Sequence, residues 1–194
     1  KERKNRKNTL KEFDSTLGYP GEGPAEKLRM CTYNVNGLNE NEGQKMQSLL
    51  SWANAKALDV IFIQEHNLGV GKHKKWRDLC RRFGFCVIHG IHALKEDRVV
   101  RARRGATALL LRMSTFDLTE NDSEIQESFE GRITSRKVIW KDMILPLVSM
   151  YVPVHPADRK KFLNKIKNSN RSIPQGAIVG GDFNCVENII LLIH

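Results

Sequence analysis

Long apolar runs are missing from this sequence, and their absence excludes a membrane-spanning helix. No run of roughly eighteen or more apolar residues, the length that a bilayer requires, occurs in the chain. The apolar stretch at 189–193 is far shorter. The first residues are basic and polar and lack the apolar segment of a secretory signal. We therefore expect an intracellular protein that does not bind a membrane.

Cysteine is scarce as well, and its spacing excludes the common zinc sites. The chain has four cysteines, with no C-x-x-C pair and no zinc spacing to histidine. Two of them, Cys31 and Cys86, lie in apolar, strand-like runs, where a free thiol packs as a small hydrophobic group. We predict buried thiols in a reducing compartment.

Positive charge is in excess, with 32 Lys and Arg against 22 Asp and Glu and a net charge of +10. Such an excess favours a polyanionic partner, either nucleic acid or an anionic surface. Residues 1–11 and 72–82 each hold six basic residues against one acid, whereas 117–130 hold six acids and no base. Because a charge run is more often an ordinary solvated face, the charge alone leaves both interpretations open.

The first 26 residues differ in composition from the rest of the chain. A basic stretch at 1–11 is followed at 12–26 by an acidic stretch with glycine and proline, and few of these residues could stabilise an ordered structure. We predict a disordered tail over 1–26 and one domain over 27–194. The basic cluster is typical of a nuclear localisation signal or a nucleic-acid-binding arm, and also of disorder without function.

Hydrophobic periodicity predicts alternating strands and helices over the domain. Residues 43–56 place apolar side chains at helical spacing, whereas 60–63 is the continuous apolar run of a strand buried on both faces. The predicted strands are 28–33, 60–63, 85–88, 106–111, 132–140, 143–152 and 177–179, and the predicted helices are 43–56, 74–83 and 156–167. Helices between buried strands indicate an α/β or α+β layered domain.

Polar side chains follow three of the predicted strands directly. They are Asn34 and Asn36 after the first strand, Glu65 after the second, and Asp182 and Asn184 after the last. Carboxylate and amide oxygens collected at the ends of adjacent strands are the hard ligands that Mg²⁺ or Mn²⁺ requires. Any one of these residues alone is explained as well by a turn or a helix cap.

Four motifs, taken in order, carry a resemblance to a known family. They read TYNVNGL, VIFIQEHNL, VSMYVPV and IVGGDFN. The series resembles the endonuclease/exonuclease/phosphatase superfamily over 28–186, and the motifs are most similar to those of the endonuclease domains of LINE-type, non-LTR retrotransposons. The resemblance implies an α+β fold of two packed mixed β-sheets flanked by helices, a four-layer αββα sandwich.

The resemblance also implies a metal site. Glu65 matches the family's glutamate that binds the catalytic Mg²⁺, and Asn34 matches the family's asparagine beside the metal. Asn36 takes a position at which family members have Asn or Asp. We accordingly predict Glu65 and Asn36 as metal ligands and Asn34 as a catalytic residue. The implied cofactor is Mg²⁺, with Mn²⁺ as an alternative.

Three further residues are matched by the resemblance to groups that act on the phosphate and the attacking water. Tyr151 matches the tyrosine that hydrogen-bonds the scissile phosphate, Asp182 the aspartate that orients and deprotonates water, and Asn184 the asparagine that supports it. Such a set hydrolyses a phosphodiester by in-line attack of hydroxide, without a covalent intermediate. If the resemblance is set aside, Tyr151 is also explained as an aromatic residue of the core, and Asp182 as a residue that forms a turn.

One motif of the family is missing from the 194 residues. Family members carry a later Ser-Asp-His motif whose histidine contacts the phosphate, and no Ser-Asp precedes His194. Because an acid–base partner commonly contributes about 10²–10⁴ in rate, we expect this chain, incomplete at its C-terminus, to be impaired in catalysis. We also expect it to expose apolar surface that further strands would cover.

The function expected from these observations is metal-dependent hydrolysis of DNA phosphodiester bonds, either by nicking or at abasic sites. The basic segments 72–82 and 98–104 favour DNA as the partner. The residues predicted to bind nucleic acid are Lys72, Lys74, Lys75, Arg77, Arg101, Arg103 and Arg104. A nuclear location and a following reverse transcriptase domain are expected, and no obligate protein partner is evident.

Two alternatives stay open on the sequence. One is a phosphatase or phospholipase of the same superfamily, acting on inositol phosphates or sphingomyelin, although no apolar membrane-facing loop is seen. The other is a catalytically inactive, nucleic-acid-binding remnant of a mobile element, which the missing Ser-Asp-His motif would explain.

Overall fold

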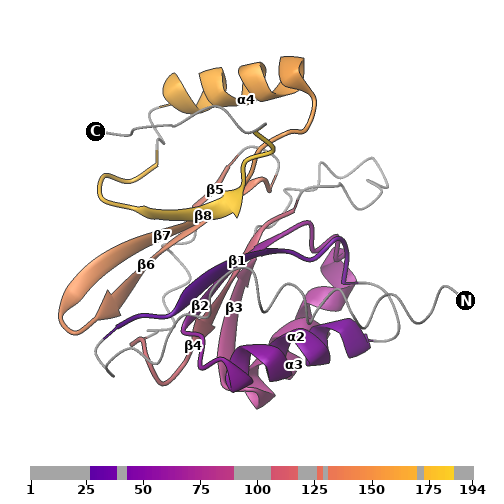
Figure 1. Cartoon of the computed structure of the whole chain (residues 1–194), viewed down its shortest axis with the longest axis vertical. Coiled ribbons are helices and arrows are strands. Elements are labelled where there is room, and N and C mark those ends of the chain that lie inside the picture. Colours follow the sequence, from indigo (N-terminus) through magenta and orange to yellow (C-terminus); the bar gives the residue numbers. More distant parts are fainter. Residues whose placement is uncertain are drawn as a thin grey trace, which may run out of the picture.

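Two four-stranded β-sheets pack face to face in the part of the chain that the structure describes (Figure 1). The structure is a computed structural model and describes residues 27–38, 43–89, 106–117, 126–128, 131–169 and 173–185. The first sheet has the order β1-β2-β4-β3, with β1 (Met30–Asn34), β2 (Val60–Gln64), β3 (Phe85–His89) and β4 (Ala108–Arg112). The second has the order β5-β6-β7-β8, with β5 (Gln126–Ser128), β6 (Ile133–Trp140), β7 (Met143–Tyr151) and β8 (Ile178–Asp182).

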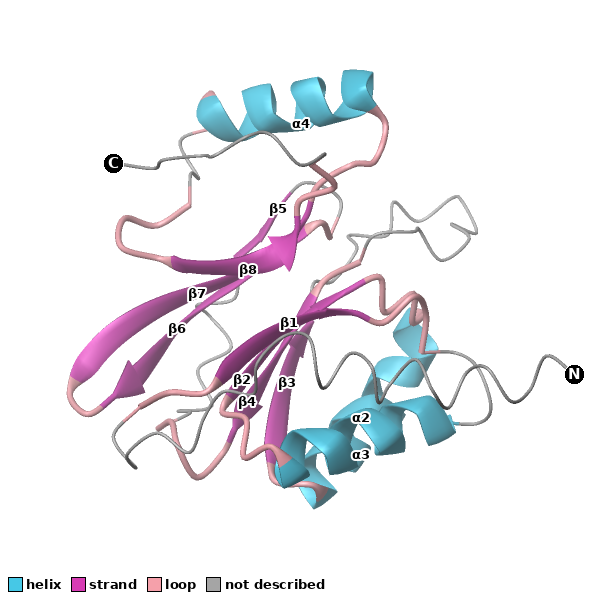
Figure 2. Ribbon diagram, in the orientation of Figure 1, coloured by secondary structure: helices cyan, strands magenta, loops and turns pink. Residues whose placement is uncertain are grey.

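Side-chain alternation along β2 shows that the first sheet is buried on both faces. Ile61 and Ile63 pack against helices α2 (Gln44–Ala55) and α3 (His73–Arg82), whereas Val60 and Phe62 pack in the core between the sheets. A strand that is apolar on both faces reads as a continuous apolar run, as β2 does. The helices contribute Met46, Leu49, Leu50 and Ala53 from α2 and Trp76, Leu79 and Cys80 from α3. Both helices therefore cover the outer face of the first sheet (Figure 2).

The second sheet divides its side chains between two layers in the same way. Leu147 of β7 packs between the sheets, whereas Val148 and Met150 pack in a separate core with Phe162 of α4 (Pro156–Lys167). Pro156 stands in the first turn of α4, where its missing N–H costs no helical hydrogen bond. The predicted four-layer αββα arrangement is confirmed, with α4 as the outer layer beside the second sheet (Figure 2).

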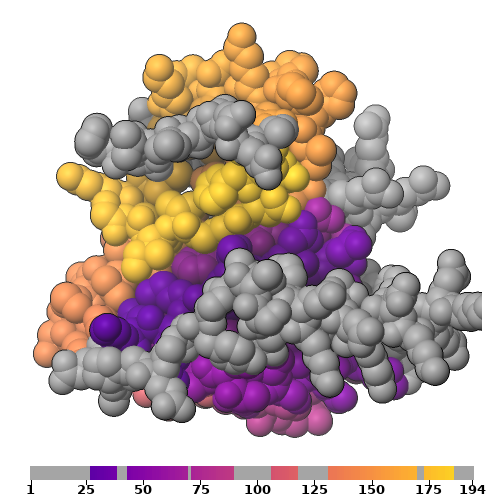
Figure 3. All heavy atoms as spheres, in the orientation of Figure 1, coloured from indigo at the N-terminus to yellow at the C-terminus, as the bar shows by residue number. Residues whose placement is uncertain are grey.

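Two glycines allow β8 to lie close to its neighbours. In the register of the second sheet Gly180 lies opposite Ser149, and a Cβ atom on Gly180 would overlap the ring of Phe62 in the first sheet. A Cβ atom on Gly181 would overlap the backbone carbonyl of Met150. Since only glycine lacks this atom, the Gly-Gly pair is required by the packing around β8. β8 also lies against β1, as the atoms in Figure 3 show.

The strands and helices predicted from periodicity are confirmed, with small shifts at their ends. The last strand runs beyond its predicted end, through both glycines to Asp182, because its pairing with β7 continues there. The short β5 and the 3₁₀ helix η3 (Val70–Lys72) are not predicted, since neither is long enough to show a period. The predicted tail 1–26, the basic segment 98–104 and the end of the predicted domain at 186–194 lie outside the described residues. None of the described helices has the length and apolar character needed to cross a bilayer.

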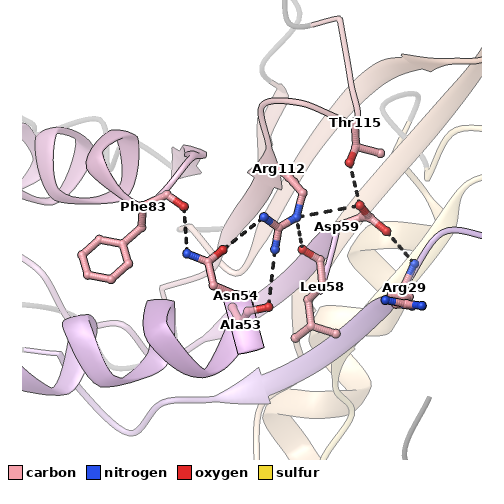
Figure 4. A network of polar contacts seen from close by, with 8 residues as sticks. All are labelled: Arg29, Ala53, Asn54, Leu58, Asp59, Phe83, Arg112 and Thr115. Carbon is pink, nitrogen blue, oxygen red and sulfur yellow. Dashed lines mark hydrogen bonds and ion pairs between the residues drawn. The ribbon is translucent and has the colours of Figure 1, made fainter. Parts of the chain in front are cut away.

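The carboxylate of Asp59 joins several segments at the end of the first sheet where β1 and β2 begin (Figure 4). The Asp59 carboxylate accepts a hydrogen bond from the backbone N–H of Arg29 at 2.9 Å and another from the Thr115 hydroxyl at 2.6 Å. Arg112 Nε lies 3.9 Å from the same carboxylate and forms an ion pair with it. The charge of Asp59 is therefore balanced within the fold.

Arg112, the last residue of β4, joins this edge of the sheet to the end of α2 (Figure 4). Its Nε donates to the Leu58 carbonyl at 2.8 Å, its Nη1 to Asn54 Oδ1 at 3.1 Å, and its Nη2 to the Ala53 carbonyl at 3.4 Å. The last carbonyls of a helix lack partners within the helix. Arg112 adds a second donor to the Ala53 carbonyl, which also accepts the Leu58 N–H at 2.9 Å, and its contacts are structural.

Candidate active site

The four strands that carry predicted site residues are paired so that their C-terminal ends reach one rim of the sandwich. β1 and β2 are parallel neighbours, and Asn34 lies opposite Gln64 at their ends. β7 and β8 are parallel neighbours, and Tyr151 lies opposite Asp182. Because side chains alternate along a strand, Tyr151 shares with Leu147 the face that looks toward the first sheet. The register alone therefore directs these side chains to the space between the sheets.

One amide group joins the two sheets at this rim. Asn34 Nδ2 donates one hydrogen bond to Glu65 Oε1 at 3.0 Å and another to Asp182 Oδ2 at 2.9 Å. Glu65 follows β2 in the first sheet, whereas Asp182 ends β8 in the second. Neither carboxylate forms an ion pair with any described residue. Two like charges are thus held on either side of a single, uncharged NH₂ group.

Three residues at this rim have a left-handed backbone conformation, with positive φ. Asn36 has φ 45°, Glu65 has φ 56° and Asn184 has φ 45°. Asparagine adopts this conformation at little cost, whereas a residue such as glutamate loses roughly 1–2 kcal/mol by it. Backbone hydrogen bonds hold the glutamate in place, including the one from the Gly37 N–H to the Glu65 carbonyl at 2.7 Å. Strain of this kind, imposed by the surrounding structure, is typical of a functional site.

Hydrogen bonds also fix the orientation of the Asp182 carboxylate. Its Oδ1 accepts the backbone N–H of Asn184 at 3.1 Å, while its Oδ2 accepts from Asn34. Asn184 is held in turn, because its Nδ2 donates to the Val152 carbonyl at 2.7 Å. Both oxygens of Asp182 therefore have a partner, and each keeps a lone pair for a further ligand.

Tyr151 stands next to these groups and keeps its proton. Its side chain is buried, and burial together with a hydrogen bond to the Glu65 carboxylate raises the pKa of Tyr151 from 10.0 to about 12. A hydrogen bond with Asn184 acts in the opposite direction. The Arg132 guanidinium lies over the Tyr151 ring, 5.2 Å from its centroid. Near neutral pH the Tyr151 hydroxyl is therefore a hydrogen-bond donor.

The structure thus brings together five of the six residues predicted for catalysis and metal binding. They are Asn34, Glu65, Tyr151, Asp182 and Asn184. Asn36 takes part through its backbone, whose N–H donates to Asn34 Oδ1 at 3.0 Å. Its side chain has no hydrogen bond to either carboxylate among the described contacts, and its role as a metal ligand stays a prediction.

The residues predicted to bind nucleic acid are exposed where the structure describes them. Lys72, Lys74, Lys75 and Arg77 all face solvent at the start of α3, while Trp76 between them is buried. His66, next to Glu65, packs against Trp76 with 5.1 Å between ring centroids. The basic end of α3 is therefore attached to the rim that carries Glu65. Arg101, Arg103 and Arg104 lie outside the described residues.

An open cleft of about 590 Å³ lies at this rim, and part of its lining is not predicted from the motifs. It is lined by Thr32, Asn34, Gln64, Gly181, Asp182, Phe183, Asn184 and Cys185. Gln64 is the one polar residue of the apolar strand β2, and this feature of the sequence could have indicated that it lines the cleft.

The free thiols are only partly as predicted. Cys31 and Cys86 are half-buried, and burial raises the pKa of Cys31 to about 12. Cys80 is buried in the core under α3. Cys185 is exposed, because it follows the end of β8 and lines the cleft. A prediction of buried thiols is therefore wrong for this residue.

The donor set of the rim fits Mg²⁺ better than zinc. The described residues hold no group of three or more His, Cys, Asp or Glu side chains that could enclose a metal ion, which a structural zinc site needs. Mg²⁺ instead is commonly bound through one or two carboxylates, with water and substrate phosphate completing its shell. Glu65 and Asp182 are hard oxygen donors of that kind.

Sequence comparison identifies the class of protein to which this arrangement belongs. A model of the Endonuclease/Exonuclease/phosphatase family matches residues 31–188. The chain belongs to this family, and the resemblance seen in its motifs is confirmed. No protein with a curated description matches the sequence significantly.

Several solved structures share the fold. The D. rerio TDP2 complex with single-strand DNA product is 22% identical, with a TM-score of 0.55 over 82% of this chain and 62% of that one. The endonuclease domain of TRAS1, a telomere-specific non-LTR retrotransposon, is 16% identical, with a TM-score of 0.53 over 83% and 61%. The AP endonuclease LMAP from Leishmania major is 20% identical, with a TM-score of 0.53 over 82% and 56%. The chain thus spans between 56% and 62% of these structures.

Proposed function

We propose that this chain is part of a divalent-metal-dependent endonuclease that hydrolyses DNA phosphodiester bonds, as in non-LTR retrotransposons. The observation that carries the proposal is the pair of carboxylates, Glu65 and Asp182, held by the single amide of Asn34 at the rim of this fold. Two carboxylates that form no ion pair with the described residues, at the end of four strands, form a site for a cation and its anionic substrate. The nuclease structures of similar fold support the same conclusion.

The chain's own groups have separate tasks in this mechanism. Glu65 would hold Mg²⁺ (or Mn²⁺), which when bound neutralises charge on the phosphate and on the leaving oxygen. Asp182, oriented by Asn34 and by the Asn184 N–H, accepts a proton from the attacking water. The single hydroxyl proton of Tyr151, which the Glu65 carboxylate accepts in this structure, would be donated to a phosphate oxygen when substrate binds. Asp182 and Asn184 act from positions that their hydrogen bonds already fix.

DNA as the substrate is supported by the exposed basic face at the start of α3. Four basic residues face solvent there, and the packing of His66 on Trp76 ties that end of the helix to the rim. Lys and Arg side chains that follow a phosphate backbone give binding its strength and its dependence on salt. The proposed site thus has its backbone-binding surface beside its catalytic groups.

Nicking of supercoiled plasmid DNA tests the proposed activity. The assay compares this chain, with and without Mg²⁺, with the chain joined to a segment that carries a Ser-Asp-His motif. We expect metal-dependent nicking by the joined protein and weak nicking by this chain alone. Absence of nicking by both proteins would contradict the proposal, and DNA binding without nicking would favour the inactive remnant. Hydrolysis of inositol phosphates or sphingomyelin in place of DNA would favour the phosphatase or phospholipase alternative.

DNA binding is tested by fluorescence anisotropy over a salt series. For a duplex, log K should fall with log salt at about −0.9 per phosphate neutralised. Changing Lys74 and Lys75 together to Ala should make this slope shallower by roughly one for each lysine that contacts a phosphate. Lys160 and Lys161, an exposed pair on α4, are the matched control, and their change to Ala should leave the slope as it is. Equal effects of both pairs would contradict the assignment of α3.

A further inference from the structure

A closed network of hydrogen bonds crosses from one sheet to the other beneath the cleft. Gln64 Nε2 donates to Ser149 Oγ at 3.3 Å, and the Ser149 hydroxyl donates back to the Ile63 carbonyl at 3.0 Å. Gln64 Oε1 accepts the Thr32 hydroxyl at 3.1 Å, and Gln64 Nε2 also donates to the Phe62 carbonyl at 3.0 Å. Gln64 is 1% exposed and Ser149 0%, so the hydrogen bond between these two side chains is buried, whereas Thr32 is exposed. Every polar atom of the Gln64 and Ser149 side chains has a partner within the network.

The position of this network relates it directly to the two carboxylates. Gln64 immediately precedes Glu65 in the first sheet. Ser149 lies opposite Gly180 in the second sheet, two residues before the pair formed by Tyr151 and Asp182 and on the same face of the sheet. The Gln64–Ser149 hydrogen bond therefore joins the two sheets one residue before Glu65 and two residues before the Tyr151–Asp182 pair.

We propose that Gln64 and Ser149 are positioning residues that set the spacing of Glu65 and Asp182 across the sheets. Apolar packing between the sheets resists separation but permits sliding, because dispersion contacts have no preferred direction. Hydrogen bonds are directional, and a fully satisfied buried network specifies one arrangement. In the observed arrangement the Asn34 amide reaches both carboxylates, at 3.0 and 2.9 Å. The inference rests on the proposed function, since it concerns the geometry of the same site.

A double variant separates positioning from stability. Ser149→Ala and Gln64→Met each remove one hydrogen bond from a buried polar partner atom, which keeps only its bond to a backbone carbonyl, and both should lower the Tm. In Gln64→Met/Ser149→Ala the two facing polar side chains are both replaced, so most of the Tm should return. The Gln64–Ser149 hydrogen bond between the sheets is still missing from this double variant. Thr107→Val is the matched control, because the buried Thr107 hydroxyl lies 2.8 Å from that of Thr134 and joins the same two sheets without preceding a carboxylate.

Two readouts that require no catalysis decide the question. Calorimetric titration with Mn²⁺ should show affinity reduced about tenfold in both single variants and in the double variant, as for other residues that orient metal ligands. The side-chain NH₂ signals of Asn34 in a metal-free ¹⁵N–¹H spectrum should shift or broaden in the same three proteins. Thr107→Val should lower the Tm while leaving both readouts at the wild-type values.

The outcomes separate failure of this inference from failure of the proposed function. If Mn²⁺ affinity and the Asn34 signals return with the Tm in the double variant, the network acts on stability alone and the inference is overturned. An equal effect of Thr107→Val overturns it as well. If the wild-type chain binds no Mn²⁺ and the joined protein does not nick DNA, the proposed function fails. The metal-free Asn34 signals then still show whether Gln64 and Ser149 hold the carboxylates in place.

Discussion

Two clusters centred on carboxylates stand at opposite ends of β2 and differ in how their charge is balanced. At the start of the strand, Asp59 receives a backbone N–H and a hydroxyl and pairs with Arg112. At its end, Glu65 and Asp182 receive uncharged donors from the described residues, chiefly the Asn34 amide, and form no ion pair with those residues. The first cluster includes its own cation, whereas the described part of the second includes two carboxylates and no ion pair.

The difference indicates which polar cluster is structural and which is functional. A buried or half-buried carboxylate stabilises a fold when its partners satisfy and balance it. Two carboxylates held together without a cation act against stability, as does the left-handed backbone of Glu65. Such an arrangement is explained by what it binds. The same residue type thus serves stability at one end of the strand and, we infer, chemistry at the other.

The largest expected effect is on catalysis at the rim. Asp182→Asn keeps the shape of the side chain but removes the base, so nicking by the joined protein should fall by about 10²–10⁴. DNA affinity in the anisotropy assay should stay within a factor of two or so, because backbone attraction is a separate contribution. Asp59→Asn, at the other end, should leave nicking per folded molecule unchanged. Cleavage by Asp182→Asn at the wild-type rate would remove the distinction between the two clusters.

Metal binding should stabilise the protein through the rim alone. At a Mg²⁺ concentration of about one hundred times Kd, the free energy of unfolding should rise by roughly 2.7 kcal/mol. Glu65→Gln should lose most of this gain, because it removes a charged ligand, whereas Asp59→Asn should keep it. Thermal denaturation with and without Mg²⁺ measures the effect. Equal stabilisation of both variants would place the metal elsewhere.

Stability without metal should respond in the opposite order. Asp59→Asn weakens the contacts with Arg112, Thr115 and the Arg29 backbone, and should cost about 1.5–3 kcal/mol. Glu65→Gln removes one of two like charges and should change the free energy of unfolding by less than about 0.5 kcal/mol. Urea denaturation in a chelating buffer measures both. A large loss in Glu65→Gln would mean that the rim carboxylate is structural after all.

The smallest expected effect is a shift in the titration of Tyr151. Its pKa is raised from 10.0 to about 12, so the stability it contributes is complete below pH 10 and is lost as pH rises toward 12. Part of the rise comes from Glu65, and Glu65→Gln should therefore lower the pKa of Tyr151. Phenolate absorbance, taken as the difference from Tyr151→Phe in each background, follows this change. An unchanged titration in Glu65→Gln would show that burial alone raises the pKa.

Much of the fold and the membership of the site followed from local features of the sequence. The apolar run of β2 and the helical spacing in α2 reflect periods of a few residues, which a sequence displays directly. Asn34, Glu65 and Asp182 each follow such a run, so their place at strand ends was predictable without coordinates. The role of Gly180 was open, because a glycine pair before a carboxylate fits a tight turn as well as a strand in close contact with a neighbouring ring.

Tertiary structure alone decided how these pieces meet. Asn34 and Asp182 are 148 positions apart and Gln64 and Ser149 are 85 apart, and no period in the sequence encodes the distance between two packed sheets. That distance depends on side chains such as Phe62 and on the missing side chain of Gly180, which touch only after folding. Packing between the sheets therefore brings one amide to two carboxylates and brings Gln64 to Ser149 beneath them. The residue types and their order were already present in the chain.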